Sequence, residues 1–514
     1  MDDKSRNYKW ASSKKRYEWK QEYENGIAPR DKDLEEELFG EDSHIPSGIN
    51  FSKYNDITVK VKGSNVPKRF DSFAEADLHP VMKENIALAR YTIPTPVQRN
   101  SISFVTAGRD LMACAQTGSG KTAAFLIPTC SSLFSQPHLI TRDNHSGRRF
   151  TAKPLVLIVA PTRELCSQIF DEARRFCYRS MLRPCAVYGG AGVPGQIQEV
   201  IAGCDVLVAA PGRLLDFMER GVISLSNVKY LILDEADRML DMGFERTIRN
   251  IVERHDLPKD RQTLLYSATF PKEIQLLARD FLRPDYLFLR VGRVGGTTTD
   301  ITQKVMWVEE QEKREKLKTI LLSQPPCRTL IFVDTKRSAD SLDNFLYQNQ
   351  FPSTSIHGDR SQMEREDAIL AFKSGTCPIL VATAVVARGI DIKNVMHVIN
   401  FDMVNDIDEY IHRIGRTARV GNAGLATSFF NNNNIPVAQD LTKVLQECQQ
   451  EIPPFLTQYI SKTLRFKDDE DDDDDLSSYQ HQLSNGTTSG GWANQEPQFN
   501  NDASGGWDPD ATPW

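Results

Sequence analysis

Short apolar runs alternate with longer amphipathic stretches over most of the chain. Between residues 70 and 290, apolar runs occur at 155–160, 206–209 and 230–233, separated by polar residues and proline. Runs of four to six apolar residues that alternate with helical patterns predict buried parallel strands in a doubly wound sheet. This part of the chain is therefore expected to form an α/β domain.

The pattern stops at a segment rich in glycine and threonine, residues 291–300, and then starts again. The second group of strand-like runs lies at 329–333, 379–382 and 397–400. A glycine-rich break between two similar patterns indicates a flexible linker between two domains. We expect two α/β lobes of similar size, at 70–290 and 301–466, each with a mostly parallel doubly wound sheet.

Polar and charged residues dominate both ends of the chain. Residues 1–69 contain few apolar clusters, and residues 467–514 are first acidic and then rich in Ser, Gly and Asn. Segments with so little apolar surface cannot build a packed core. The first is expected to be a mostly flexible extension and the second a disordered tail.

The net charge of the 514-residue chain is −7, but it is unevenly distributed. Lys467 is the last basic residue and twelve acidic residues follow it, so the rest of the chain carries +5. A mildly basic body with an acidic tail permits nucleic-acid binding without proving it. The acidic run 468–475 is interpreted first as a solvating tail, and second as a segment that competes with RNA for a basic cleft.

Cysteine usage and hydropathy limit the class of protein. Nine cysteines are scattered along the chain without a Cys-x-x-Cys pair, which is typical of reduced thiols in an intracellular protein rather than of disulfides or a zinc site. No run of about 18 apolar residues occurs, so no membrane span is expected. The first five residues lack the apolar core of a secretion signal.

A glycine-rich loop stands where a strand would meet a helix. Its residues are Ala115, Gln116, Thr117, Gly118, Ser119, Gly120, Lys121 and Thr122, after the apolar run 111–114. Glycines let backbone N–H groups turn toward phosphates, and a helix N-terminus adds positive potential. In such a loop Lys121 reaches the β- and γ-phosphates of a nucleotide and the Thr122 hydroxyl ligates Mg²⁺. Ala115 is a mild departure, because the general pattern has Gly there.

Acidic residues follow the strand-like run 230–233 directly. Asp234, Glu235 and Asp237 would lie at the carboxyl end of a strand, where open α/β sheets place ligands. We assign Asp234 to Mg²⁺, directly or through water, and Glu235 to orienting the attacking water. An isolated acidic pair would be interpreted as part of a solvated loop. Here the phosphate loop, expected one strand end away, favours a metal site instead.

These motifs together resemble the DEAD-box family of ATP-dependent RNA helicases. Residues 234–237 spell the motif after which the family is named. The other motifs follow in the family's order: Phe73 with 91–98, then 161–165, 189–190, 211–213, 267–269, 362–365, 383–391 and 412–419. The resemblance covers about residues 70–465 and implies two RecA-like P-loop lobes with RNA-stimulated ATP hydrolysis.

The resemblance also implies how ATP is bound. Phe73 and Tyr91 would stack on the adenine, and the Gln98 amide would pair with its N6 and N7 atoms. The same motif includes Thr92, Ile93, Pro94, Thr95, Pro96 and Val97. Asp391 would hold the ribose. Plain core packing is the alternative interpretation of the two aromatic residues.

Catalysis is expected to require both lobes. Arg416 and Arg419 would stabilise the charge of the transferring γ-phosphoryl group. His412 and Arg413 would link to the acids and to Ser267 and Thr269. Surface charge is the alternative interpretation of the two phosphate-directed arginines.

RNA contacts are expected at phosphate and sugar, which position the strand without reading its sequence. They are assigned to Arg163, Gly190, Gly212, Arg213, Gln362, Arg365 and Thr383. Closure of both lobes on one strand would bend it beyond what a duplex tolerates, so unwinding is expected to be local rather than processive. The loop 135–153 could touch RNA as well, or be a solvated loop.

Two positions depart from the family pattern. Ala210 stands where Thr is usual, and the missing hydroxyl–phosphate bond is expected to cost about 1–3 kcal/mol of RNA binding. Ala418 stands where Gly is usual, and little effect is expected. Arg/Gly repeats are absent from the tail, which argues against RNA annealing by it.

The subgroup most similar to this chain is the Vasa- and Belle-like one, because of residues 48–54, Arg90 and Ala384. This analogy implies a cytoplasmic protein with a monomeric core that acts on messenger RNA in translation initiation. Its partners, recruited by the tails, would be translation-initiation or ribonucleoprotein-granule proteins. Two alternatives stay open: an ATP-gated RNA clamp that rarely unwinds, and a P-loop ATPase acting on a protein or small molecule.

Overall fold

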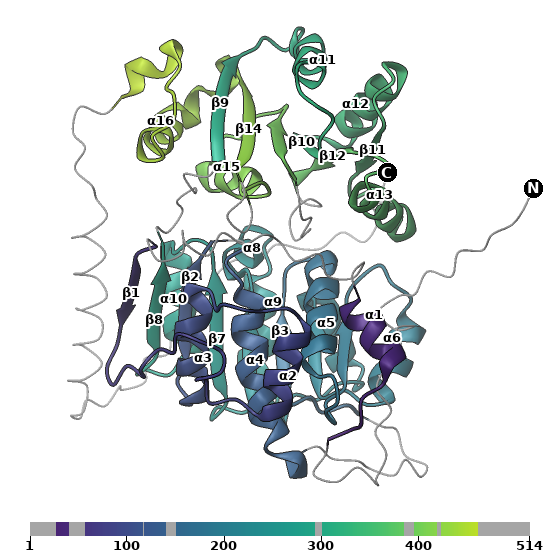
Figure 1. Ribbon diagram of the computed structural model, residues 1–514, viewed down its shortest axis with the longest axis vertical. Helices are drawn as coiled ribbons and strands as arrows, with labels where there is room; N and C mark the ends of the chain where they lie inside the picture. Colours follow the sequence, from purple (N-terminus) through teal and green to yellow (C-terminus); the bar gives the residue numbers. More distant parts are fainter. Residues whose placement is uncertain are drawn as a thin grey trace, which may run out of the picture. The chain divides into compact units, whose positions relative to one another are not determined.

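The computed structural model describes residues 27–40, 57–116, 118–139, 151–292, 301–384, 395–418 and 423–460. Within these ranges the chain forms two α/β lobes, each built on its own sheet (Figure 1). The first sheet has eight strands and the second six, and nearly all neighbouring strands are parallel. The expected fold class is confirmed. No helix in these ranges is long and apolar enough to cross a membrane.

The sheet of the first lobe has the strand order β1-β8-β2-β7-β6-β3-β5-β4. Its strands are β1 (Val59–Lys62), β2 (Leu111–Ala115), β3 (Val156–Val159), β4 (Pro184–Val187), β5 (Val206–Ala209), β6 (Tyr230–Leu233), β7 (Gln262–Ser267) and β8 (Leu287–Val291). Val156 and Ile158 of β3 pack into the core on one face, and Leu157 and Val159 into the core on the other. Burial on both faces explains why these strands are continuous apolar runs.

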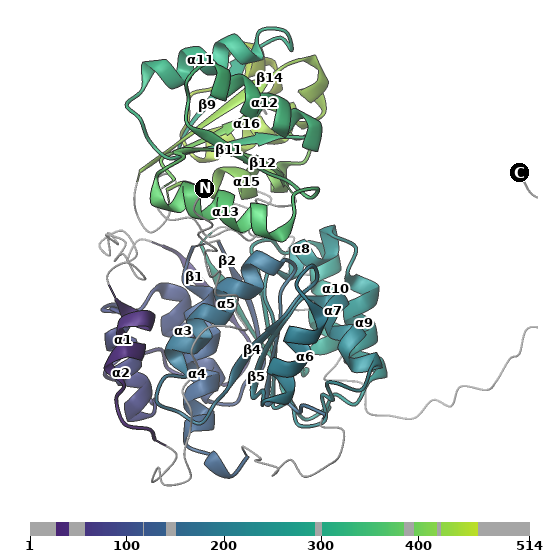
Figure 2. The same ribbon diagram turned by 90° about the vertical axis from the view of Figure 1, so that its right-hand side faces the viewer.

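Helices cover both faces of this sheet (Figure 2). One layer contains α2 (Pro80–Leu88), α3 (Pro96–Thr106), α4 (Lys121–Phe134) and α5 (Arg163–Phe176). The other contains α6 (Val193–Ile201), α7 (Pro211–Glu219), α8 (Ala236–Asp241), α9 (Glu245–Arg254) and α10 (Lys272–Phe281). A 3₁₀ turn, Pro137–Leu139, follows α4. Threonines begin two of the helices: the side chains of Thr95 and Thr162 accept hydrogen bonds from backbone N–H groups in the first turn.

The second lobe has the strand order β11-β12-β10-β13-β14-β9, with every neighbouring pair parallel. Its strands are β9 (Ile301–Trp307), β10 (Thr329–Val333), β11 (Ser353–Ile356), β12 (Ile379–Thr383), β13 (His397–Asn400) and β14 (Gly424–Phe430). Ile331 and Val333 pack under α11 (Lys313–Ser323) and α12 (Lys336–Gln348), whereas Leu330 and Phe332 pack under α13 (Gln362–Ser374). α15 (Ile407–Ile414), α16 (Ala438–Glu447) and two 3₁₀ turns, Asn432–Val437 and Pro454–Tyr459, complete the lobe.

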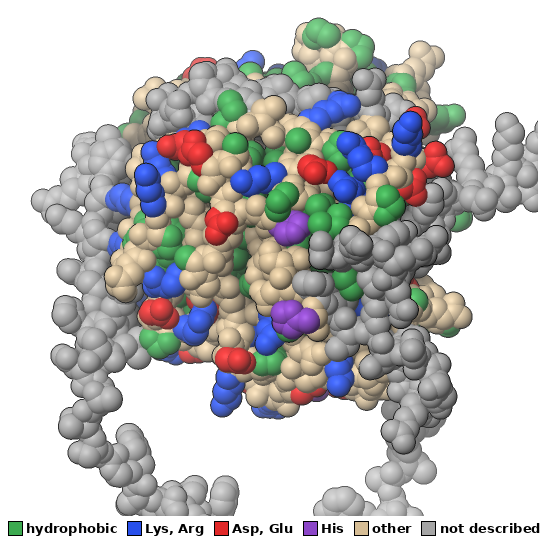
Figure 3. Space-filling model, turned by 60° about the horizontal axis from the view of Figure 1, so that its bottom comes forward, with side chains coloured by type: hydrophobic (Ala, Val, Ile, Leu, Met, Phe, Trp, Pro, Cys, Tyr) green, Lys and Arg blue, Asp and Glu red, His purple; other side chains and the backbone are tan. Residues whose placement is uncertain are grey.

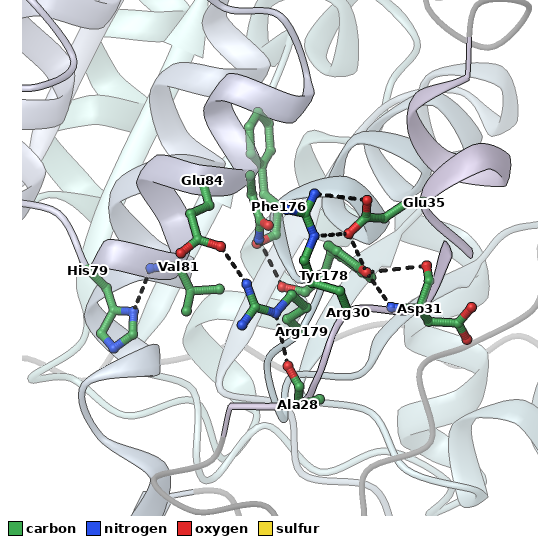
Figure 4. Close-up of polar contacts among 11 residues, drawn as sticks. Ala28, Arg30, Asp31, Glu35, His79, Val81, Glu84, Phe176, Tyr178 and Arg179 are labelled. Carbon is green, nitrogen blue, oxygen red and sulfur yellow. Dashed lines mark hydrogen bonds and ion pairs between the residues drawn. The ribbon is translucent and has the colours of Figure 1, made fainter. Parts of the chain in front are cut away.

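Part of the expected flexible extension is ordered, so that prediction is wrong for residues 27–40. Asp31 caps the helix α1 (Lys32–Phe39), whose Leu34, Leu38 and Phe39 are buried against Ala89 and Tyr178. The Tyr178 hydroxyl donates to Glu35 Oε1 at 2.9 Å and accepts from the Asp31 N–H at 2.9 Å (Figure 4). Three apolar side chains together with the Tyr178 hydroxyl therefore dock this segment on the first lobe.

The boundaries of the first lobe also differ from the expected ones. β1 lies inside the expected extension and pairs antiparallel with β8, Val59 opposite Val291 and Val61 opposite Leu289. Val291 and Gly292, expected to be linker, belong to the first lobe, since the Gly292 N–H donates to the Thr58 carbonyl at 2.8 Å. Residues 1–26, 41–56, 293–300 and 461–514, which hold the rest of the extension, the linker and the tail, lie outside the described residues.

Candidate active site

The motifs of the first lobe meet because of strand order. β2, β7 and β6 are neighbours and parallel, so their carboxyl ends lie at the same edge of the sheet. The phosphate loop follows β2, Ser267 ends β7, and Asp234 follows β6. Residues that are more than 100 positions apart in sequence thus share one edge, which is the usual place for ligands in such sheets.

The phosphate loop turns on two glycines in the left-handed region, Gly118 with φ of 81° and Gly120 with φ of 90°. The Lys121 ammonium donates to the Ala115 carbonyl at 2.7 Å, and the Ser119 hydroxyl donates to the Gln116 carbonyl at 2.8 Å. These contacts hold the loop compact above the N-terminus of α4, with Thr122 half-buried beside it. Thr117 lies outside the described residues.

Gln98 is completely buried and both ends of its amide are used inside the lobe. Its Oε1 accepts from the Thr95 N–H at 3.0 Å, and its Nε2 donates to the Gly120 carbonyl at 3.2 Å. A Cβ on Gly120 would lie 2.5 Å from that nitrogen. Gln98, expected to pair with adenine, therefore also connects the start of α3 to the phosphate loop by hydrogen bonds.

The two aromatic residues expected at the adenine pack against each other. The rings of Phe73 and Tyr91 meet edge to face with centroids 6.4 Å apart, and Tyr91 also contacts Phe176 at 5.9 Å. Phe73 is 7% exposed and is part of the main core of the lobe. Of the remaining residues in this motif, Thr92 and Ile93 are exposed, whereas Pro94, Thr95, Pro96 and Val97 are buried.

The acidic motif is buried. Burial raises the pKa of Asp234 to about 7, although the Lys121 charge opposes this shift. A buried carboxylate with so little compensation fits a site for a divalent cation, which would favour its ionised form. Within the described residues, no group of three or more His, Cys, Asp or Glu could enclose a metal ion alone. Mg²⁺ commonly binds through one or two protein groups together with phosphates and water, so Asp234 and Thr122 suit it.

Asp237 joins the acidic motif to the end of β7. Its Oδ2 accepts from the Ala268 N–H at 3.0 Å, from the Thr269 N–H at 2.9 Å and from the Thr269 hydroxyl at 3.0 Å. Ser267 is fully buried, and its hydroxyl has no hydrogen-bond partner among the described residues. Of the two expected coupling hydroxyls, it is that of Thr269 that contacts the acids.

The motif at residues 412–419 lies in the second lobe, and three of its residues differ in the groups that they contact. His412 Nε2 lies 3.9 Å from Asp237 Oδ2, and burial, with the Arg238 and Arg416 charges, lowers the pKa of His412 well below its usual range. Arg416 is buried and donates from Nε to the His412 carbonyl at 3.2 Å. Arg413, expected to link to the acids, instead donates to the Asp402 carbonyl at 2.7 Å within its own lobe. Arg419 and Asp391 lie outside the described residues.

The expected RNA contacts include two residues that touch each other. Arg163 lies over Gly190, whose φ is 76° and where a Cβ would come within 1.7 Å of the guanidinium. Arg163 Nη1 also donates to Gln362 Oε1 at 3.2 Å. Arg365 forms an ion pair with Glu164, and both side chains are buried. Sequence reasoning missed Glu164, although the same five-residue motif contains it.

The other residues expected to contact RNA lie at the ends of separate strands or helices. Gly212 is exposed and Arg213 half-buried at the start of α7, with Arg213 stacked 5.5 Å above the Phe217 ring. Thr383 is buried at the end of β12. On the face drawn in Figure 3, the described Lys and Arg side chains alternate with Asp and Glu side chains. That face therefore offers a polyanion no patch of one sign.

Comparisons with known proteins agree with this geometry. The sequence model of the DEAD/DEAH box helicase domain matches residues 95–277, and that of the helicase conserved C-terminal domain matches residues 312–421. A DEAD box protein from Methanococcus jannaschii is 34% identical, with 75% of this chain and 99% of that chain covered and a TM-score of 0.43. Dbp5 of S. cerevisiae, bound to RNA and ADP BeF3, is 26% identical, with 80% and 100% covered and a TM-score of 0.61.

The match spans both lobes and nearly the whole length of these relatives. The phosphate loop, the acidic motif and the end of β7 lie together at one edge of the first sheet, as ATP hydrolysis requires. The chain therefore belongs to the DEAD-box family of ATP-dependent RNA helicases.

Proposed function

We propose that this helicase uses Mg²⁺ and ATP to close on single-stranded RNA and to separate short duplexes locally. The observation that carries the proposal is the shared sheet edge of Lys121, Glu235 and Thr269, at the ends of three adjacent strands. Thr122 and Asp234 would hold Mg²⁺. When bound, the ion would neutralise phosphate charge and orient the γ-phosphoryl group for in-line attack.

The nucleotide would enter between the phosphate loop and the aromatic pair. Lys121 would leave the Ala115 carbonyl and move to the β- and γ-phosphates, since its present partner is only a neutral oxygen. An amide can donate two and accept two hydrogen bonds, and the contacts of Gln98 with Thr95 and Gly120 use one of each. Gln98 could thus pair with adenine after a local rearrangement that exposes it. The proposed ribose contact of Asp391 completes this site.

Hydrolysis would be completed by groups from both lobes. Glu235 would orient the attacking water, and Arg416 and Arg419 would stabilise the charge on the γ-phosphoryl group. The contact of His412 with Asp237, which is bonded to Thr269, supports a link between the second lobe and the end of β7. RNA would raise turnover because it favours the arrangement in which both sets of residues act together.

Single-stranded RNA would be held by its backbone. The Dbp5 structure was obtained with RNA and ADP BeF3, which supports an RNA-bound state of this fold with a nucleotide analogue. Arg163, Gly190, Gly212, Arg213, Gln362, Arg365 and Thr383 are the proposed contacts. The proposal requires Arg163 and Arg365 to exchange their present partners, Gln362 and Glu164, at least in part for phosphates.

Two variants of the full chain test this function. Glu235→Gln keeps the side-chain volume and should bind ATP and RNA, yet hydrolyse ATP about 10²–10⁴-fold more slowly and retain RNA longer. Lys121→Ala should lose activity because nucleotide affinity and phosphate stabilisation both fall. The measurements are ATPase rate with and without single-stranded RNA, and displacement of a short duplex. Equal ATPase rates with and without RNA would overturn the proposal.

We also propose cytoplasmic work on messenger RNA in translation initiation, by analogy with Vasa- and Belle-like proteins. Residues 48–54, Arg90 and Ala384 support this subgroup. Initiation or ribonucleoprotein-granule proteins would be recruited through the two ends of the chain. The test is translation of a reporter with a short leader hairpin in a depleted extract. Restoration by wild type but not by Glu235→Gln is expected, and restoration by both would exclude a helicase role there.

A further inference from the structure

Arg238 is a charged side chain buried where the proposed mechanism does not use it. It lies in the first turn of α8, is 2% exposed, and is the largest fully buried side chain of the described residues. Its Nε and Nη1 atoms have no hydrogen-bond partner among the described residues. Burying a guanidinium without full compensation is costly, so a retained charge at this position needs a reason.

Among the described residues, the acidic atom closest to this guanidinium belongs to the proposed catalytic carboxylate. Arg238 Nε lies 3.6 Å from Glu235 Oε2, three residues earlier in the chain. That oxygen has no hydrogen-bond partner in the described part of the chain. By contrast, Asp234 accepts from the Glu235 N–H at 3.0 Å, and Asp237 accepts from four donors. Among the described residues, the guanidinium thus faces the carboxylate oxygen of the motif that no hydrogen bond holds in place.

The backbone of Glu235 is itself strained. Its φ of 52° and ψ of 52° lie in the left-handed region, which costs a residue with a side chain roughly 1–2 kcal/mol. Such a conformation persists when the surroundings demand it, often at functional sites. Here the turn from β6 into α8 directs the carboxylate, and the ion pair with Arg238 limits where its end can move.

We propose that Arg238 is a positioning residue for ATP hydrolysis, holding the Glu235 carboxylate in the orientation in which it aligns the attacking water. The inference rests on the proposed role of Glu235 and makes it more specific. Arg238 itself would touch neither ATP nor water. Its removal should therefore slow the chemical step and leave the binding of ATP and RNA nearly intact.

Arg238→Met is the informative variant, because Met fills similar volume without charge. Removing one partner of a buried ion pair can cost about 3–5 kcal/mol, so thermal unfolding of the variant is measured first to establish that it is folded at the assay temperature. The expected result is a fall in RNA-stimulated kcat of about 10–100-fold, with the KM for ATP within about threefold of wild type. Arg238→Lys, which keeps the charge, should recover most of the loss. Release of labelled single-stranded RNA in the presence of ATP should slow, as in Glu235→Gln.

A double variant separates positioning from general damage. If Arg238 acts through Glu235, Glu235→Gln with Arg238→Met should be no slower than Glu235→Gln alone, within about twofold. Arg261→Met is the matched control. Arg261 is also a buried arginine of the first lobe, bonded through Nη1 to the Pro258 carbonyl at 2.8 Å, and its replacement should leave kcat unchanged.

Several results would overturn the inference. It fails if Arg238→Met keeps the wild-type kcat, or if its KM for ATP rises by the same factor as kcat falls. It also fails if the kcat of the double variant falls by the product of the two single-variant factors. An equal loss in Arg261→Met would point to a general effect of buried arginines instead. If Glu235→Gln itself hydrolyses ATP normally, the proposed function of Glu235 fails first, and that outcome is read from the single variant alone.

Discussion

The Asp237 carboxylate accepts two hydrogen bonds from Thr269, one from the backbone N–H at 2.9 Å and one from the hydroxyl at 3.0 Å. This pair ties the start of α8 to the end of β7, and hence the acidic motif to the residues after Ser267. The Ser267 hydroxyl, two residues away, is buried with no hydrogen-bond partner within the described ranges. Two neighbouring hydroxyls of one motif therefore have different structural roles.

Replacement of these hydroxyls should give different stabilities. Thr269→Val removes a donor from a buried carboxylate and should lower the free energy of unfolding by about 1–3 kcal/mol, whereas Thr269→Ser should restore it. Ser267→Ala removes a hydroxyl that makes no such bond and should change stability by less than about 0.5 kcal/mol. Urea unfolding of the three variants is the measurement. A Ser267→Ala loss as large as that of Thr269→Val would contradict the assignment.

The backbone lies in the left-handed region, which favours glycine, at two positions that depart from glycine in this chain. Arg90 has a φ of 60° and Ala418 a φ of 51°. Arg90 is exposed, so Arg90→Gly should relieve strain without losing packing and raise the free energy of unfolding by about 1 kcal/mol. Arg90→Ala, which keeps the Cβ, should gain nothing. Thermal unfolding distinguishes them, and an equal gain in both would exclude backbone strain as the cause.

Ala418→Gly should change stability less than Arg90→Gly. The Ala418 methyl group is 9% exposed and belongs to the second-lobe core, so its removal costs about 0.8 kcal/mol of burial. That loss offsets the strain relieved. The expected small effect thus has a physical reason that the sequence did not supply. A stabilisation of Ala418→Gly greater than that of Arg90→Gly would contradict this account.

Ala210 is the N-cap residue of α7 and provides no side-chain acceptor for the helix. Thr162 occupies the equivalent position before α5 and accepts from the Leu165 N–H at 3.3 Å. Ala210→Thr should therefore raise the free energy of unfolding by about 1 kcal/mol, in addition to the proposed gain in RNA affinity. Ala210→Val is the control without a hydroxyl. Titration of labelled RNA at fixed salt tests the second effect, and tighter binding by the Val variant as well would exclude the hydroxyl as its source.

His397 should make the second lobe sensitive to acid. It is 1% exposed, with Nδ1 2.8 Å from Gln324 Oε1 and Nε2 2.8 Å from Thr427 Oγ1. Burial lowers its pKa to about 4, and the Lys304 charge contributes. Since the unfolded chain binds the proton more tightly, stability is complete above about pH 6.5 and falls by about 3 kcal/mol in total as the pH drops to about 4.

His397→Gln removes this titration and is the matched variant. Urea unfolding at pH 7.5 and pH 5 gives the free energy of unfolding that each protein loses on acidification. This loss should be smaller in the variant, because one fewer proton is taken up on unfolding, which accounts for roughly 1.4 kcal/mol per pH unit. Other groups titrate equally in both proteins and cancel in the comparison. Identical losses would mean that His397 is not the acid-sensitive group.

Local pattern determined most of the architecture. The strands β3, β5, β6, β10 and β12 were predictable because both of their faces are buried, which makes each an almost continuous apolar run. The phosphate loop was predictable for a related reason, since left-handed turns such as those at Gly118 and Gly120 favour glycine. The motif order alone pointed to the family.

Tertiary structure decided what depends on contacts between distant residues. β1 is an edge strand whose Val59 and Val61 alternate with lysines, and α1 offers only three apolar side chains, so neither has a strong local signal. The burial of Arg238 and the separate roles of Ser267 and Thr269 follow from the strand order β2-β7-β6. The hydrogen bond between Gln98 and Gly120 follows from the packing of α3 against α4. A sequence records which side chains are present, but only folding determines which of them lose water and which partner each then finds.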